Sequence, residues 1–202
     1  MARPRKFEDR DIIEKVIDLF WEKGYEGASM DELARVTGLK RGSLYNAFGT
    51  KYDLFLLAIE QQGEVEYGKA TRNHLQQVAD DKSALAAVQW FFDLILEDVK
   101  NDNRSGCFIF NVVTQQAPAD AKVESLVQKY LDALRNTFKG IFQSVTEKKK
   151  GLSKEDAEAL ADTVMATYMG LCTYARVGYD LDVLQGLSDV TLSIIKSYID
   201  DA

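Results

Sequence analysis

The segment SMDELARVTGLKRGSLYNAF, residues 29–48, carries the clearest structural signal in the sequence. It begins with a capping box, because the Ser29 hydroxyl can accept a hydrogen bond from the Glu32 amide while the Glu32 carboxylate reaches back to the Ser29 amide. Gly38 can adopt the left-handed conformation that a sharp turn demands. The pattern therefore predicts two short helices, one ending at Gly38 and one over about residues 41–48, joined by a tight turn.

The spacing of three residues makes this prediction specific. Counted from Met30, a helix-turn-helix needs a small residue at the fifth position for close approach, a glycine at the ninth for the turn and an apolar anchor at the fifteenth. Ala34, Gly38 and Leu44 fill these positions. The second helix of such a motif lies in the major groove of DNA. The alternative is a helical hairpin without a function.

Helices are also predicted on both sides of this segment. Apolar residues recur at spacings of three and four over about residues 9–23, and Gly24 follows, where a helix C-terminal glycine belongs. Thr50 and Asp53 repeat the capping pattern before a longer helix over residues 51–67.

Charge is unevenly distributed along the chain. Residues 1–51 carry ten lysines and arginines against nine aspartates and glutamates, a net charge of +1, whereas the rest carries 15 against 23, a net charge of −8. The total of −7 taken alone speaks against a nucleic-acid partner, because phosphate binding needs a positive surface. However, Lys40, Arg41 and Lys51 lie in a stretch, residues 33–52, that has no carboxylate.

The stretches GASMDELA (27–34) and GLKRGSLYNAFGTKYDL (38–54) resemble the DNA-binding head of the tetracycline-repressor (TetR/AcrR) family. The resemblance is close over about residues 8–58, while the remainder resembles the family only in length and helical character. It implies an all-α protein of about nine helices, with a three-helix head and a helical-bundle body. It also implies a homodimer built on the last two helices, a palindromic double-stranded DNA operator, and release from DNA when a small-molecule effector occupies the body.

The recognition helix supplies most of the expected DNA contacts. Lys40 and Arg41 can reach phosphate or the acceptor edge of guanine, and Ser43 and Asn46 can hydrogen-bond to bases. Tyr45 resembles the family's tyrosine that contacts the backbone or a thymine methyl. The family often has histidine in place of Asn46, which leaves the base preference open. Leu44 and Phe48 are expected in the core.

Two further candidates stand where helices begin. Lys51 and Ser29 can each hold a phosphate with the help of helix N-terminal amides. The complete set of expected DNA contacts is Ser29, Lys40, Arg41, Gly42, Ser43, Tyr45, Asn46 and Lys51.

The rest of the chain predicts five more helices. No segment alternates apolar and polar residues with a period of two, so strands have little support and the fold class is all-α. The five helices are expected over about residues 82–100, 106–115, 120–147, 154–177 and 183–200. We expect residues 1–50 to bind DNA, a fourth helix over 51–68 to connect, and residues 69–202 to sense a ligand and dimerise.

The last two helices are the expected dimer interface. Ala166, Gly170 and Thr173 allow a neighbouring helix to come close, and the final helix carries more apolar surface than a monomer should expose. The alternative is that its apolar residues only close the core of one chain. These residues are Leu184, Leu187, Leu192, Ile195, Tyr198 and Ile199.

A ligand pocket is expected among the body helices, lined by aromatic and apolar residues with a few polar groups. For each candidate, plain core packing is the alternative. His74, the single histidine, is expected at the surface of a linker and not as a metal ligand. The candidates are Trp90, Phe91, Cys107, Phe110, Asn111, Phe138, Tyr168 and Tyr174.

Cys107 suggests a different kind of sensor. A helix N-terminus and the nearby Arg104 are both expected to lower the pKa of its thiol, which would make it reactive. A few relatives of the resembled family use a thiol in this way, so a repressor that senses electrophiles or oxidants through Cys107 is one alternative function. A DNA-binding adaptor without a small ligand is another.

An enzyme is not expected, because the sequence has no paired histidines at metal spacing, no phosphate-binding glycine loop and no Gly-x-Ser-x-Gly elbow. No cofactor or metal is implied. The two cysteines, Cys107 and Cys172, do not suggest a disulfide scaffold, and a reducing cytoplasm fits them. No apolar run has the length of a membrane span or a signal peptide, so we expect no membrane partner.

Overall fold

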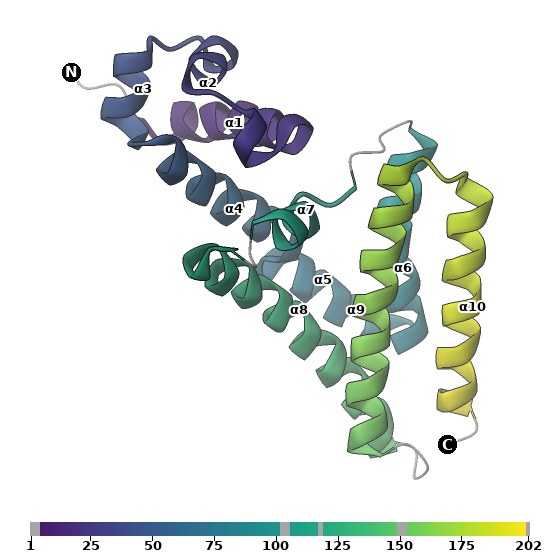
Figure 1. The fold of residues 1–202 in the computed structure, drawn as a ribbon. Coiled ribbons are helices and arrows are strands. Elements are labelled where there is room, and N and C mark those ends of the chain that lie inside the picture. Colours follow the sequence, from purple (N-terminus) through teal and green to yellow (C-terminus); the bar gives the residue numbers. More distant parts are fainter. Residues whose placement is uncertain (1–4, 102–105, 117–118, 149–152, 201–202) are drawn as a thin grey trace.

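The computed structural model describes residues 5–101, 106–116, 119–148 and 153–200, and the regular structure in these ranges is helical (Figure 1). The helices are α1 (Arg5–Gly27), α2 (Met30–Thr37), α3 (Arg41–Phe48), α4 (Lys51–Tyr67), α5 (Lys69–Asp81), α6 (Ala84–Lys100), α7 (Phe108–Gln115), α8 (Ala121–Lys148), α9 (Lys154–Val177) and α10 (Leu181–Asp200). The prediction of an all-α protein is confirmed.

Helices α4 and α5 meet at Gly68. Its amide donates to the Glu64 carbonyl of α4, and its own carbonyl accepts from the Arg72 amide of α5. If α4 and α5 are counted as one bent helix, the described ranges contain the expected nine helices. The prediction of a linker around His74 is wrong, because this residue lies on α5. His74 is exposed, as expected, and its ring centroid lies 4.4 Å from that of Trp90.

The head is formed by α1, α2 and α3 around the first part of α4 (Figure 1). Gly24 has a φ of 71° and interrupts α1 where its end was predicted. Val16 of α1, Leu33 of α2 and Leu54 of α4 are fully buried and belong to the shared apolar core. Burial of this core holds the two short helices, which are too short to be stable alone.

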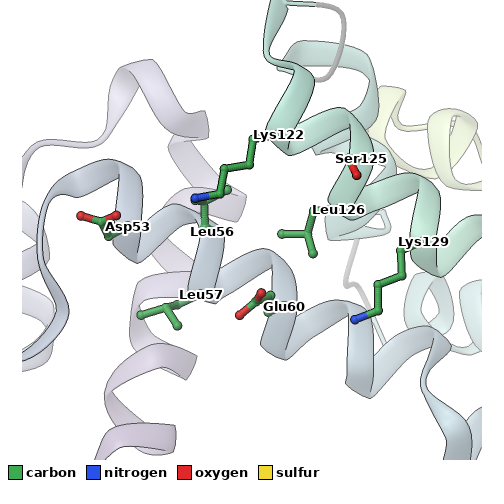
Figure 2. Close-up of a pocket in the computed structure, with 8 residues that line it drawn as sticks. All are labelled: Asp53, Leu56, Leu57, Glu60, Lys122, Ser125, Leu126 and Lys129. Atoms are coloured by element: carbon green, nitrogen blue, oxygen red, sulfur yellow. The ribbon is translucent and has the colours of Figure 1, made fainter.

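Helix α4 runs from the head into the body and packs against α1 and α8 (Figure 1). The ring of Tyr130 on α8 lies against Gly63 of α4, and its hydroxyl donates to the Glu60 carbonyl at 3.1 Å. A groove of about 520 Å³ follows this junction, with Leu56 on one wall and Lys122 and Lys129 reaching across from α8 (Figure 2). The head thus contacts the body along α4, and also through α1, where the ring centroid of Trp21 lies 5.8 Å from that of Phe108 on α7.

The body packs α6, α8, α9 and α10 around an aromatic core. The rings of Phe91 and Tyr168 stack with centroids 4.1 Å apart, and Phe138 approaches Phe91 at 5.3 Å. Helices α9 and α10 lie side by side at the edge of the molecule (Figure 1). Among the helices in the described ranges, none is both long and apolar enough to cross a membrane.

Candidate nucleic-acid interface

Helix α3 presents its polar side chains to solvent. Leu44 is fully buried and Phe48 is half-buried against the core, so the prediction that both serve packing is confirmed. Lys40, just before the helix, is exposed. The exposed candidates on the helix itself are Arg41, Gly42, Ser43, Tyr45 and Asn46.

The turn before α3 has the predicted form. Gly38 has a φ of 73°, in the left-handed region, and its amide donates to the Arg35 carbonyl. The Lys40 carbonyl then accepts from the Leu44 amide at 3.0 Å and starts α3. This left-handed turn sets the angle between the two helices. A residue with a side chain would be strained at this position, so the turn requires glycine.

Ser29 forms the predicted capping box. Its amide donates to the Glu32 carboxylate at 3.0 Å, and its hydroxyl accepts from the Glu32 amide at 3.2 Å. Lys23 of α1 and Ser29 bind the Glu32 carboxylate and lower its pKa to about 2, so the cap stays ionised. A phosphate contact from Ser29 would therefore have to coexist with these bonds or replace them.

The half-buried Lys51 side chain binds backbone carbonyls of the head. Its ammonium donates to the carbonyls of Tyr25 at 2.8 Å and Ala28 at 2.9 Å, and it lies 4.2 Å from the centroid of the Tyr25 ring. These bonds satisfy carbonyls at the end of α1 and fix the start of α4. Sequence reasoning missed this packing role, because the two carbonyls are more than 20 residues away in the chain.

Asp31 is a residue that sequence reasoning did not select. Its carboxylate on α2 accepts a hydrogen bond from the Arg41 guanidinium on α3 at 3.1 Å. The signal in the sequence is slight, because a carboxylate near the start of a helix is ordinarily explained by the helix dipole. The turn at Gly38 brings the two side chains together on the exposed side of the motif.

The structure divides the ligand-pocket candidates into several places. Four of them pack together and fill the space between α6, α7, α8 and α9 with their own rings: Phe91, Phe138, Phe110 and Tyr168. The ring centroids of Phe110 and Tyr168 lie 5.7 Å apart. Three others lie apart from this aromatic cluster. Trp90 lies beside His74, and Asn111 is half-buried on α7. Tyr174 is exposed and stacks on Tyr179, with the ring centroids 4.5 Å apart.

Cys107 is buried and does not have the expected environment. Its thiol lies 2.6 Å from the Tyr67 hydroxyl and donates to the Glu66 carboxylate at 2.9 Å. Burial, followed by the charge of Glu66, raises the pKa of this thiol well above its usual value. The predicted lowering of the pKa is therefore wrong, and Arg104, on which it partly depended, lies outside the described residues.

The expected interface residues of α10 fall on two faces. Leu184, Leu192 and Ile195 are buried against the rest of the same chain, so for these three the core alternative is correct. Leu187 and Tyr198 are exposed. They belong to an apolar stripe along α10 formed by Val183, Leu187, Val190, Ile194 and Tyr198.

Comparison with known proteins covers both parts of the chain. Residues 12–58 match the model of bacterial regulatory proteins of the tetR family, and residues 84–190 match the C-terminal domain of LmrA/YxaF-like transcriptional regulators. The chain is 28% identical over 197 residues to the uncharacterized HTH-type transcriptional regulator YezE of Bacillus subtilis, covering 96% of this chain and 100% of that protein. It is 24% identical over 194 residues to the HTH-type transcriptional repressor ComR of Escherichia coli, covering 96% and 91%.

Solved structures show the same fold. A cysteine mutant of the TetR family regulator CifR, complexed with a 26 bp operator duplex, is similar with a TM-score of 0.79 and 22% identity, covering 95% of this chain and 98% of that one. The regulatory protein TetR from Rhodobacter sphaeroides is similar with a TM-score of 0.77 and 21% identity, covering 93% and 98%. Since the C-terminal model spans more than half of the chain, the protein belongs to the TetR family, with an LmrA/YxaF-like C-terminal domain, and is a helix-turn-helix DNA-binding transcriptional regulator and not an enzyme.

Proposed function

We propose that this regulator is a homodimeric repressor that binds a palindromic operator through α3 and leaves it when a small molecule binds the body. Residues 1–50 would contact DNA, the helix over 51–68 would connect, and residues 69–202 would dimerise and sense the effector. The observation that carries this proposal is the exposed polar surface of α3. The buried Leu44 anchors the opposite side of this helix in the core.

Repression is favoured by the relatives that match most of the chain. ComR and BdcR of Escherichia coli are both named repressors and cover 96% and 99% of this chain. FasR of Mycolicibacterium smegmatis is named an activator, and its match covers 59%. DNA as the partner of α3 is supported by the fold that this chain shares with CifR, which was solved with operator DNA.

The apolar stripe of α10 supports a dimer. Val190 is 60% exposed and Val177, at the end of α9, is 71% exposed. Apolar side chains repeated along one face of a helix are costly in water. Because these side chains are about half exposed, covering each one stabilises by roughly 1 kcal/mol, half of the gain for full burial. A second copy of the chain would cover them in a symmetric interface, and two recognition helices on one duplex multiply specificity.

An effector in the body is supported by the position of a cluster of polar groups that are buried or half-buried. Glu66 near the end of α4 bonds to Cys107 just before α7 and to Gln62 one turn earlier on α4. A molecule that competes for these bonds would act directly on the helix that carries the head. The burial and raised pKa of Cys107 favour this reading over direct chemistry at the thiol.

Selection from a pool of random duplexes tests the proposal. We expect the protein to enrich an inverted repeat whose half-sites are about one helical turn, roughly 10 bp, apart. Arg41→Ala serves as the matched variant and should enrich a less defined sequence. Enrichment of a single half-site bound by one chain, or of no sequence, would contradict the proposal.

A further inference from the structure

The exposed sides of α2 and α3 are joined by the ion pair between Asp31 and Arg41. The Arg41 Nη1 atom lies 3.1 Å from the Asp31 Oδ1 atom, and the two side chains are 56% and 77% exposed. Within the described ranges, neither side chain forms another hydrogen bond or ion pair. The pair therefore lies at the surface on which DNA is proposed to bind.

The helix dipole favours a carboxylate in the first turn of α2, but it does not determine which group Asp31 contacts. This carboxylate repels phosphate, while the following residues 33–52 carry no acid at all. Capping of α2 does not require it, because Ser29 and Glu32 already satisfy the helix start. Its contact with Arg41 is the interaction that the structure gives it.

We propose that Asp31 is a positioning residue that directs Arg41 to a guanine in the major groove. The inference rests on the proposed operator binding by α3. A guanidinium carries five N–H donors in a rigid plane, and the bond to Asp31 uses one of them. The others remain for the O6 and N7 acceptors of guanine, the base that arginine recognises through two bonds.

The ion pair favours a base over the backbone for two physical reasons. It offsets the charge of Arg41, so attraction to phosphate is weaker there than at Lys40, which forms no ion pair with the part of the chain that the structure describes. It also restricts the rotamers of a long side chain before DNA arrives, so less conformational entropy is lost on binding. Lys40 would contact the backbone and Arg41 the base.

A double-mutant cycle on the selected duplex tests this role. Affinities are measured for wild type, Asp31→Asn, Arg41→Ala and the double variant, on the duplex and on versions with each G·C pair of a half-site replaced by A·T. We expect Arg41→Ala to lose roughly 5- to 100-fold discrimination at one G·C pair per half-site. Asp31→Asn should weaken discrimination at that same pair and bind unrelated duplex more tightly.

The decisive comparison is made in the absence of Arg41. There, Asp31→Asn should leave discrimination unchanged, because its partner is gone. Equal effects with and without Arg41, or full discrimination in Asp31→Asn, would overturn the inference. Asp18→Asn on α1 is the matched control, an exposed head carboxylate that should not affect discrimination. Failure to select any duplex would instead count against the proposed function.

Discussion

The hydroxyl of Tyr52, in the first turn of α4, donates a hydrogen bond to the Asp120 carboxylate, 3.0 Å away at the start of α8. The same carboxylate oxygen accepts from the amides of Lys122 and Val123. One side chain therefore caps a body helix and holds the helix that carries the head. With the Tyr130–Gly63 contact further along α4, it defines the angle at which the head is presented.

Gly63→Ala is expected to disturb this junction. A Cβ at residue 63 would lie 2.5 Å from the Tyr130 ring, so α4 and α8 would have to move apart. Overpacking of this kind costs about 1–3 kcal/mol. Gly140→Ala on α8 is the matched control, since its Cβ meets nothing within 4 Å, and it should stabilise by about 0.5–1 kcal/mol. Chemical denaturation measures both, and an unchanged Gly63→Ala would contradict this packing.

Lys51→Met separates the two roles of this lysine. Loss of its bonds to the Tyr25 and Ala28 carbonyls should lower the free energy of unfolding by about 1–3 kcal/mol. If Lys51 also contacts phosphate, the salt slope of DNA binding falls by about one. Lys40→Met, at an exposed site, should lower the slope without a change in stability. A fully stable Lys51→Met would remove the packing role.

Glu66→Gln should stabilise the protein at neutral pH. Burial raises the pKa of Glu66 in the folded state, so the folded protein loses stability as the pH rises through that value. Glutamine carries no charge and avoids this loss, and its advantage over glutamate should therefore shrink toward pH 4. Denaturation at pH 7.5 and pH 4.5 measures the difference. An advantage that is the same at both values would exclude an ionised Glu66 as the cause.

Val190→Glu should disrupt the proposed dimer. A carboxylate in the middle of the apolar stripe would be buried without a partner when two chains meet. Ser193→Glu, on the same helix but outside the stripe, is the matched control and should remain dimeric. Sedimentation velocity distinguishes the two, and a dimeric Val190→Glu would show that chains associate through a different surface.

Local patterns in the sequence were sufficient for the motif and for the described helices other than α5, which was expected to be a linker. Ser29, Thr50 and Ser153 each form a full capping box. Gly38 and Gly178 stand at helix ends with positive φ, and Gly24, also with positive φ, interrupts α1. Such signals act within one turn of helix, so they can be read without knowing the fold.

Roles that depend on distant parts of the chain could not be predicted. Cys107 looked reactive from its neighbours, but Tyr67 and Glu66, some 40 residues away, surround its thiol. The apolar positions of α10 cover more than one helix face, so periodicity alone did not separate the buried Leu192 from the exposed Val190. Burial is decided by packing between helices, which the local sequence does not encode.

Paired charge reversals show whether DNA binds at α3. One variant combines Lys40→Glu with Arg41→Glu at α3. The other combines Lys122→Glu with Lys129→Glu in the groove between α4 and α8 (Figure 2), so both variants change the net charge by the same amount. On the selected duplex at fixed salt, we predict that the first pair weakens binding at least about a hundredfold and that the second leaves it within about threefold. Equal losses in both variants, or full affinity in the first, would mean that α3 is not the DNA-binding surface.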